Sequence, residues 1–357
     1  MTDAPASITM VGVDPSCLGG IATLARGLCD RFSRDAAGDF AYIVSSNQSS
    51  AFGKAAVFAR ALCSLRRRLN AIDPATHIVH IHMADNASVM RARVVVNMAK
   101  KRGVKTLVHV HCDLAKIYET SSSSMKTAIE DVMRACDAVV ALGSYMRDFA
   151  ASFGHGRDSF FVLPNAVSCP ASNPFDARSH KALFLGNVSQ DKGVLDLLDA
   201  LAVVKENLPV DASVDLCGRD FLSIQDRIRE RGLADIVNYR GVVSPDDGFF
   251  AHYGLHVLPS HKEALPFALL EASAHGIPSV VTDAGSMAEV VASDEDGLVV
   301  RVGDVSALGD CIRRMLSDDA LRSKMSREVF EKTKAMYSMD AYMRKLGGLY
   351  ERVLIVP

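Results

Sequence analysis

The sequence predicts an α/β protein built from two doubly wound domains, each with a parallel sheet. Its 357 residues are too many for one hydrophobic core and suit two domains of ordinary size. Hydrophobic residues make up 49% of the chain and charged residues 23%, which is typical of a packed globular protein and excludes a disordered one. Short β-branched runs alternate with helical patterns, and this alternation is the βα rhythm of a parallel sheet.

The first half of the chain carries this rhythm from a strand expected at 8–13 and a helix expected at 21–32. The strands expected next in this half lie at 41–45, 78–83, 106–111 and 138–141. Serines fill positions 121–124, and this low-complexity run predicts a flexible loop. Pro, Asn and Ser gather between 163 and 181, a composition typical of a loop, so the first domain is expected to end there.

The βα rhythm resumes beyond that loop, and a second doubly wound domain fits the pattern. Its expected strands lie at 182–185, 213–217, 238–240, 256–258, 279–281 and 297–300. We therefore expect the following division: an N-terminal Rossmann-like domain over 1–168, a hinge over 169–180, a C-terminal Rossmann-like domain over 181–327 and a helical segment over 328–357. Packing back on the first domain is one arrangement open to that last segment.

Charge and cysteine usage exclude several classes of protein. Forty basic and forty-two acidic side chains give a formal charge of −2, so no overall field draws the protein to nucleic acid. The eight cysteines form no C-x-x-C pair and the N-terminus lacks a secretory signal, which together indicate reduced thiols and a cytoplasmic location. No uncharged apolar run reaches the ~18 residues of a membrane span. No spacing of His, Cys or Asp suggests zinc, and neither G-x-x-x-x-G-K-[ST] nor G-x-G-x-x-G is present.

The segment 255–279 carries the most chemistry. A buried strand leads into a polar loop and then into a helix, with Pro266 at its expected first position and Gly276 just past its end. The start of this helix is expected at the carboxyl edge of a parallel sheet, where its free amides and positive dipole end attract a phosphate. Glu263 precedes the helix and Glu271 lies within it. Because carboxylates repel phosphate, we expect them to bind hydroxyl groups, which sugars supply.

The run from Glu263 to Glu271 reads E-A-L-P-F-A-L-L-E and resembles the E-x7-E motif of the retaining GT-B glycosyltransferases of family 4, also called glycosyltransferase group 1. The resemblance implies that Glu263 contacts the transferred sugar and that Glu271 contacts the ribose of the nucleotide. It also implies that backbone amides at the helix start lie near the diphosphate. The donor-binding residues expected in this motif are Leu265, Pro266, Phe267, Ala268 and Glu271. An ordinary amphipathic helix with two solvated acids is the alternative for this segment alone.

A second strand-to-helix turn, at 183–193, adds a cation. Lys192 in this turn can neutralise a departing diphosphate without a metal ion, and a solvated lysine at a helix start is the alternative. The resemblance implies an arginine and a lysine here, both on the diphosphate. Asn187 stands where that arginine is expected, so the chain departs from the family's pattern by one positive charge. Backbone contacts around Arg219 and Val242 are expected to decide the choice of base.

Further candidates lie in the first half. Gly19 and Gly20 follow the first strand, where glycines let a phosphate approach the backbone, and an ordinary turn is the alternative. The strand 106–111 places His109 and His111 on one face because side chains alternate with period two. His111 lies at the carboxyl end of the strand and is expected to contact the donor sugar, as the resemblance implies. His109 is expected to be a core residue bonded to backbone.

Two polar segments have both a functional and a structural interpretation. Asp113 and Lys116 are candidates to orient the acceptor, with a polar surface loop as the alternative. Asp294, Glu295 and Asp296 formally match the D-x-D motif of metal-dependent glycosyltransferases, but they precede a glycine and a strand, which indicates a surface turn.

The segment 52–69 places basic residues between apolar residues at helical spacing. A basic amphipathic helix can dock on anionic lipid headgroups, and a domain helix with a solvated basic face is equally compatible. Lipid-linked acceptors are common in the family that the chain resembles. They favour a peripheral position at the inner face of the cell membrane.

The resemblance implies two Rossmann-like domains facing each other across a cleft, which is the GT-B arrangement. We expect a cytoplasmic enzyme without metal or cofactor that moves a hexose, with retention, from a nucleotide diphosphate sugar to a glycan or lipid-linked acceptor in envelope or exopolysaccharide synthesis. The expected catalytic residues are His111, Lys192 and Glu263. Two alternatives stay open: a catalytically silent partner of an active glycosyltransferase, which Asn187 favours, and an epimerase acting on a nucleotide sugar.

Overall fold

The computed structural model describes residues 7–17, 19–35, 38–154 and 159–355, and the chain divides into two compact units. The first unit runs to Asn165 and takes up the chain again from Tyr342, whereas Ala166–Ala341 form the second unit. The division falls shortly before the expected hinge, and the expected C-terminal segment is shared between the two units. Residues 1–6 of the expected N-terminal domain and residues 356–357 of the expected C-terminal segment lie outside the described residues.

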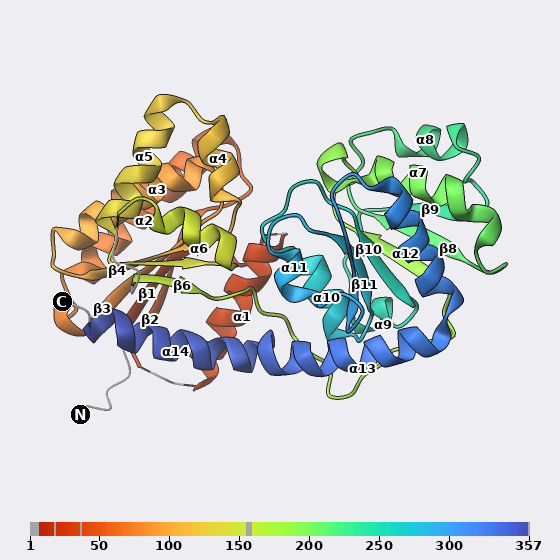
Figure 1. The fold of residues 1–357 in the computed structure, drawn as a ribbon. Helices are drawn as coiled ribbons and strands as arrows, with labels where there is room; N and C mark the ends of the chain where they lie inside the picture. The colour runs from red at the N-terminus through yellow and green to blue at the C-terminus, as the bar shows by residue number, and fades with distance from the viewer. Residues whose placement is uncertain (1–6, 18, 36–37, 155–158, 356–357) are drawn as a thin grey trace. The chain divides into compact units, whose positions relative to one another are not determined.

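The first unit holds a parallel sheet that contains six strands within its described residues, in the order β2-β1-β3-β4-β5-β6 (Figure 1). The strands are β1 (Ser7–Val13), β2 (Phe40–Ser46), β3 (His77–Met83), β4 (Lys105–Val110), β5 (Ala138–Ala141) and β6 (Phe160–Val162). The helices are α1 (Gly20–Asp35), α2 (Ala51–Leu69), α3 (Asn86–Lys100), α4 (Leu114–Thr120), α5 (Ser123–Ala135), α6 (Ser144–Ala151) and most of α14 (Met339–Ile355). Val79, Ile81 and Met83 of β3 point into a core shared with α2, α3 and α5. His80 and His82 therefore lie on the opposite face.

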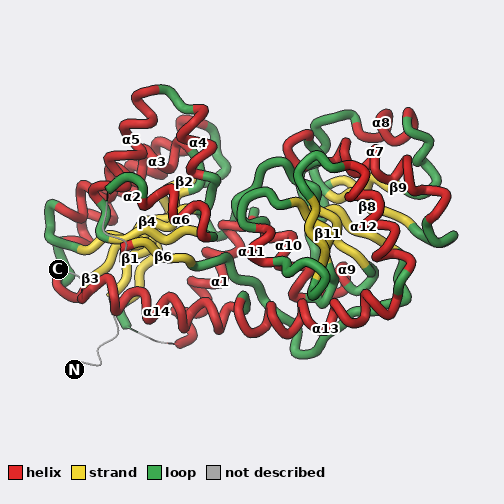
Figure 2. Tube along the Cα trace, in the orientation of Figure 1, coloured by secondary structure: helices red, strands yellow, loops and turns green. Residues whose placement is uncertain are grey.

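The second unit holds a second parallel sheet, whose strands are drawn in yellow in Figure 2. Among its described residues the sheet has six strands in the order β12-β11-β10-β7-β8-β9. The strands are β7 (Lys181–Leu185), β8 (Ser213–Cys217), β9 (Val237–Gly241), β10 (Leu255–Leu258), β11 (Ser279–Thr282) and β12 (Gly297–Val300). The helices are α7 (Val194–Val204), α8 (Ile224–Glu230), α9 (Asp247–Phe250), α10 (Phe267–Ala274), α11 (Met287–Val290), α12 (Val305–Ser317) and α13 (Asp319–Met336), with a 3-10 turn η3 (Gln190–Lys192) before α7.

Each sheet reverses its direction of growth once. In the first sheet the chain adds β2 on one side of β1 and then continues from β3 on the other side. In the second sheet it adds β8 and β9 on one side of β7 and then continues from β10 on the other side. Ligands of open α/β sheets bind at such a switch point, beyond the carboxyl ends of the strands. The pairs β1/β3 and β7/β10 therefore mark where to search for sites.

The predicted fold class is confirmed. Each strand expected from the sequence occurs with its ends within one residue of the prediction, and the βα alternation gives two doubly wound sheets. The strand β6 was not predicted, since three residues are too few for a readable pattern.

Two local expectations hold only in part. Ser121 and Ser122 lie in the link between α4 and α5, but α5 begins at Ser123, and the Ser122 hydroxyl accepts a hydrogen bond from the Met125 amide, as a helix cap does. The acidic turn at 294–296 is not wholly on the surface. Asp296 is only 2% exposed, and its carboxylate accepts a hydrogen bond from Lys332 Nζ at 2.6 Å. A partner distant in sequence makes that burial possible, since a buried carboxylate needs a pairing charge.

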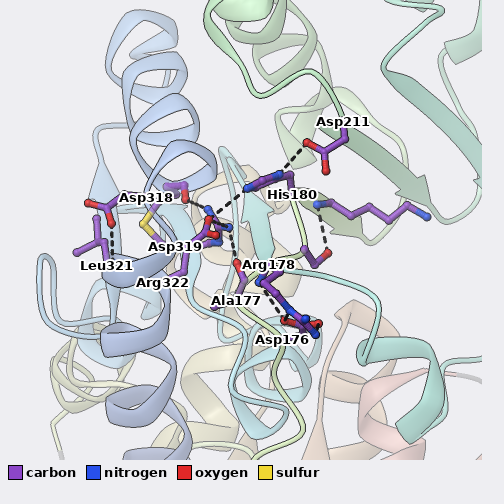
Figure 3. A network of polar contacts seen from close by, with 12 residues as sticks. Asp176, Ala177, Arg178, His180, Asp211, Asp318, Asp319, Leu321 and Arg322 are labelled. Carbon is purple, nitrogen blue, oxygen red and sulfur yellow. Dashed lines mark hydrogen bonds and ion pairs between the residues drawn. The ribbon is translucent and has the colours of Figure 1, made fainter.

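A network of hydrogen bonds and ion pairs joins residues 176–180, at the end of the expected hinge, to α13 (Figure 3). Arg322 is fully buried and donates hydrogen bonds to the carbonyl of Ala177 and to the Asp319 carboxylate, the latter at 2.6 Å. The ring nitrogens of His180 lie 2.8 Å from Asp211 Oδ1 and 3.2 Å from Asp319 Oδ1. Because a buried guanidinium is costly without such partners, this network holds the segment before β7 against the second unit.

The helix α2 occurs where the sequence predicts it, and its apolar side is used in the core. Leu65 and Leu69 are buried there, and Phe58 and Leu62 pack against them. The exposed cations of α2 are Lys54, Arg60, Arg66 and Arg67. A contact of α2 with a membrane would thus rest on charge and on Phe52, which is 87% exposed. Among the described residues, we find no helix with the length and apolar composition to cross a bilayer.

Candidate functional site

Lys192 and Glu263 meet at the switch point of the second sheet. Lys192 ends η3, which follows β7, and Glu263 lies in the loop after β10, the strand that pairs with β7. The Lys192 ammonium contacts Oε1 of Glu263, and the Ser260 hydroxyl donates a hydrogen bond to the same oxygen at 3.2 Å. The Lys192 side chain is 25% exposed and the Glu263 side chain 9%. A mostly buried ion pair therefore stands at the carboxyl edge of the sheet.

Two glycines allow the loops around this pair to approach closely. Gly193 has a φ of +67°, and a Cβ there would lie 1.8 Å from the carbonyl oxygen of Pro259. Gly285 has a φ of +58°, and a Cβ there would lie 2.1 Å from the carbonyl oxygen of Glu263. Only glycine combines a left-handed backbone with such contacts. The loops after β7, β10 and β11 are thereby packed backbone to backbone around Glu263.

Polar contacts add to this packing. The His261 ring lies 2.6 Å from Asp196 Oδ2, and the Lys262 ammonium donates to Asp191 Oδ1 at 2.7 Å. The amide of His261 donates to the carbonyl of Asp191 at 2.8 Å. These bonds cross between the turn that bears Lys192 and the loop that bears Glu263. The ion pair is therefore held by its supporting loops before any ligand arrives.

The helix α10 begins at Phe267, and Pro266 is its cap rather than its first residue as expected. Pro266 offers no side-chain hydrogen bond to the first turn. Amides at a helix start attract anions, so this helix start suits a phosphate beside Lys192. Gly276, with φ +70°, follows the end of the helix as predicted. Leu265, in the turn before α10, is buried.

Glu271 lies within α10 and is only partly exposed. Burial raises the pKa of the Glu271 carboxyl above its usual 4.5, and the nearby His275 works in the opposite direction. Hydrogen bonds from hydroxyl groups stabilise a carboxylate that water solvates poorly, and a ribose has two hydroxyl groups that can donate them. Phe267 and Ala268 in the first turn are likewise partly exposed.

Asn187, Arg219 and Val242 lie near the ends of β7, β8 and β9. Asn187 and Arg219 are exposed, and Val242 is 70% exposed. The amide of Val188 donates to the carbonyl of Arg219 at 2.9 Å, so the turns that bear Asn187 and Arg219 run side by side. The Arg219 guanidinium lies 5.2 Å from the centre of the Phe221 ring. Arg219 after β8 therefore places a cation next to the turn after β7, where the resemblance implies an arginine and this chain has Asn187.

A pocket of about 280 Å³ lies at the switch point of the first sheet. Gly12 and Val13 at the end of β1, Gly19 and Gly20 at the start of α1, and His82 at the end of β3 line it together with Arg91 of α3 and residues of neighbouring turns. The loop with the two glycines therefore borders a cavity, as the sequence suggested. The Arg91 side chain, 19% exposed, brings a positive charge to its wall.

Four histidines form a block on one face of this sheet, next to the pocket. His80 and His82 come from β3, His109 is the cross-strand partner of His82 on β4, and His111 follows β4 directly. Neighbouring rings stack with centroids 4.0–5.6 Å apart. His82 Nδ1 lies 2.8 Å from His111 Nε2. The sequence pointed to His109 and His111, whereas His80 and His82 were missed, although their spacing of two on a strand was a readable signal.

Burial keeps these imidazoles neutral. It lowers the pKa of His82 to about 4, and it lowers the pKa values of the other three well below 6.5, with repulsion between neighbouring rings adding to the effect. His80 and His109 are fully buried, whereas His82 and His111 are each 8% exposed. His111 therefore stands near the edge of the block, where its position after the strand predicts it.

Asp113 and Lys116 belong to α4. The Asp113 carboxylate caps this helix by accepting a hydrogen bond from the Lys116 amide at 3.0 Å, and the Lys116 ammonium lies 3.4 Å from Glu119. Both side chains thus have contacts within α4. Their role toward an acceptor stays a prediction.

The expected site residues fall into two groups, one in each unit. The first group consists of Gly19, Gly20, His111, Asp113 and Lys116. The second consists of Asn187, Lys192, Arg219, Val242, Glu263, Leu265, Pro266, Phe267, Ala268 and Glu271. Only the second group contains the E-x7-E motif, so the comparison with known proteins bears first on that unit.

Residues 170–332 match the family model described as Glycosyl transferases group 1. A poly(glycerol-phosphate) alpha-glucosyltransferase of Bacillus subtilis is 25% identical over 204 residues, which cover 56% of this chain and 30% of that protein. The chain spans 30–56% of the length of the first curated relatives it matches.

Solved structures share the fold over nearly the whole chain. A sucrose-phosphate synthase from Thermosynechococcus elongatus has a TM-score of 0.78 at 17% identity, covering 98% of this chain and 99% of that one. HepE of Anabaena, solved in complex with UDP, has a TM-score of 0.74 at 14% identity, covering 97% and 99%. These identities show the fold alone, which is the GT-B type. The family match goes further for the second unit, where residues 170–332 are similar to the glycosyl transferases group 1 domain.

Proposed function

We propose that this protein is a retaining glycosyltransferase of family 4 that moves a hexose from a nucleotide diphosphate sugar to a glycan or lipid-linked acceptor. The observation that carries the proposal is the Lys192–Glu263 pair at the switch point between β7 and β10, beside the start of α10. A cation, a carboxylate and free helix amides at one sheet edge suit a ligand that is both anionic and rich in hydroxyl groups. A nucleotide diphosphate sugar has both properties.

In this proposal Lys192 and the amides of Phe267 and Ala268 bind the diphosphate. As the bond to the sugar breaks, negative charge grows on the departing diphosphate, and a fixed ammonium stabilises that charge without a divalent ion in the same role. The Lys192 side chain is partly exposed, so it can exchange Glu263 for a phosphate oxygen without leaving its turn. Arg219, one strand away from Asn187, is the cation we assign to the place of the missing arginine.

Glu263 binds the hydroxyl groups of the transferred sugar, and Glu271 binds the ribose. Glu263 already accepts hydrogen bonds from Lys192 and Ser260, which fixes its orientation. When Lys192 turns to a phosphate oxygen, Ser260 still holds the carboxylate, and we assign Glu263 the role of positioning the sugar. Departure of the diphosphate with attack on the same face then gives retention. The contact of His111 with the sugar and the backbone contacts of Arg219 and Val242 with the base belong to the same proposal.

The names of similar proteins support the substrate class. A poly(glycerol-phosphate) alpha-glucosyltransferase is among the relatives, and HepE was solved with UDP. We therefore propose a uridine diphosphate sugar as the first donor to test and an envelope or exopolysaccharide glycan as the acceptor class. A position at the inner face of the cell membrane, through the exposed cations of α2, would bring the enzyme to a lipid-linked acceptor.

The test is a thermal-shift and hydrolysis screen of the pure protein against UDP-, GDP-, ADP- and TDP-sugars, with and without Mg²⁺ or Mn²⁺. We expect one donor to raise the Tm and to turn over in either case. Glu263→Gln should abolish this response, whereas Glu230→Gln, which changes an exposed carboxylate on α8, should retain it. A Glu263→Gln variant that keeps the wild-type response would remove Glu263 from the site.

The same screen separates the alternatives. No response to any donor favours the silent-partner interpretation, and a new nucleotide sugar formed without acceptor favours an epimerase. With an acceptor present, a product of inverted anomeric configuration contradicts the retaining mechanism.

A further inference from the structure

The histidine block in the first unit offers ligands that the proposed glycosyl transfer does not use. His80, His82 and His109 each present one nitrogen, and these three nitrogens lie within 4.8 Å of one another. Two of the ligands come from one strand at a spacing of two, and the third comes from the neighbouring strand in register with His82. We propose that His80, His82 and His109 bind a single transition-metal ion, with Zn²⁺ as the best fit.

Hydrogen bonds around the block engage one nitrogen of His80 and one of His82, and leave the other nitrogen of each ring available to an ion. His80 Nδ1 lies 2.7 Å from the hydroxyl of Tyr350, and His82 Nδ1 lies 2.8 Å from His111 Nε2. If each Nδ1 carries the proton and donates it, the Nε2 atoms of His80 and His82 hold free lone pairs. Neither of these Nε2 atoms has a hydrogen-bond partner within the part of the chain that the structure describes. Metal-bound imidazoles show the same pattern, with one nitrogen on the metal and the other donating to a second group.

The donor set selects the kind of metal. Neutral imidazole nitrogens suit zinc and other late transition metals, whereas Mg²⁺ and Ca²⁺ require oxygen ligands. Zinc binds histidine nitrogen at about 2.0–2.1 Å, so tetrahedral ligand nitrogens lie roughly 3.4 Å apart. The three nitrogens must therefore close in by up to about 1.4 Å, and the stacked rings, whose planes differ by 20–29°, must rotate so that their lone pairs meet at one ion. Three histidines with a fourth position open to water or an anion is a known zinc set.

The pocket beside His82 gives the ion a route and a fourth ligand. His80 and His109 are fully buried, but His82 is 8% exposed and lines the 280 Å³ pocket. A bound ion would hold His82 with its Nδ1 proton directed at His111 Nε2. The metal thus makes His82 a positioning residue for His111, which goes beyond the proposed transfer chemistry.

The test uses the full-length protein without a histidine tag. Metal analysis by mass spectrometry should find about one zinc per chain, and Co²⁺ added after removal of zinc should give the strong visible bands of a tetrahedral site. His80→Gln and His109→Gln should each weaken Co²⁺ binding at least ~10-fold, and Tyr350→Phe about 10-fold through the lost partner of His80. His256→Gln is the matched control, because His256 is an equally buried histidine of the second unit. It should bind Co²⁺ as the wild type does.

Two outcomes overturn the proposal. One is wild-type protein that contains no zinc and gives no tetrahedral Co²⁺ spectrum. The other is unchanged Co²⁺ affinity in both ligand variants. Circular dichroism checks that the variants fold, and where they do not, the wild-type spectrum alone decides. Because no arm measures sugar transfer, failure here leaves the glycosyltransferase proposal standing.

Discussion

Substitution of Gly193 by alanine should separate backbone strain from damage to the proposed donor site. A Cβ at this position would stand 1.8 Å from the Pro259 carbonyl oxygen, whereas real Cβ contacts stay beyond 3.0 Å, so the loops must part by at least 1.2 Å. The left-handed backbone costs an alanine about 1–2 kcal/mol, and forced repacking costs about 1–3 kcal/mol more. The parting falls between Lys192 and Glu263, and a misplacement of ~1 Å can cost about 100-fold in rate.

Gly232→Ala is the control, since Gly232 has a φ of +64° but a Cβ added there would meet nothing within 4 Å. It carries only the left-handed strain, about 1–2 kcal/mol. For a unit of this size each kcal/mol lowers the Tm by roughly 2–4 °C. Gly193→Ala should therefore melt about 2–12 °C below Gly232→Ala and should lose about 100-fold in donor hydrolysis, whereas Gly232→Ala should keep its activity. Scanning calorimetry and a hydrolysis assay measure both. Equal melting and equal activity in the two variants would refute the reasoning.

Three further predictions follow from the same structure. Lys192→Met should reduce donor turnover about 100-fold, whereas Lys205→Met, which removes the pair with Asp235, should leave it unchanged; equal loss in both would contradict the role of Lys192. Burial raises the pKa of Glu271 in the folded chain, so stability falls as the pH rises from 4.5 through that raised pKa. Glu271→Gln should thus melt higher than the wild type at pH 7 and alike at pH 4, while binding a nucleotide donor more weakly; an unchanged Tm at pH 7 would count against the burial argument. Replacing the four exposed cations of α2 by glutamine should abolish sedimentation with anionic vesicles at low salt, and a wild type that stays in the supernatant would remove the membrane contact.

The sequence predicts the sheets well because most strands are short runs rich in apolar and β-branched residues between helical patterns. The placement of Lys192 and Glu263 in the loops after strands, and of Glu271 in the helix that follows, could also be predicted from local patterns. The contact between Lys192 and Glu263 could not be predicted. Lys192 and Glu263 are 71 residues apart, and only the adjacency of β7 and β10 brings their side chains together.

The other features that the sequence did not predict also depend on contacts between residues that are distant in sequence. Asp296 resembles a surface turn until Lys332, on a helix late in the chain, covers it. The histidine block arises because β3 and β4 are neighbours in register, so a pattern that is unremarkable on either strand becomes a cluster of rings across the two. The spacing of His80 and His82 along β3 can be read from the sequence, but the third ligand lies on β4, and only the pairing of the two strands brings His109 to them.

The discontinuity of the first unit has a consequence for how the protein is made. Residues up to Asn165 leave the ribosome first, but the helix that completes their unit, with Tyr350 against His80, comes only after the 176 residues from Ala166 to Ala341. At translation rates of about 5–20 residues per second, the wait lasts roughly 9–35 s. During that time the histidine face of the first sheet lacks α14 as its cover. The docking of α14, which brings Tyr350 to His80, is therefore a late step in completing the first unit.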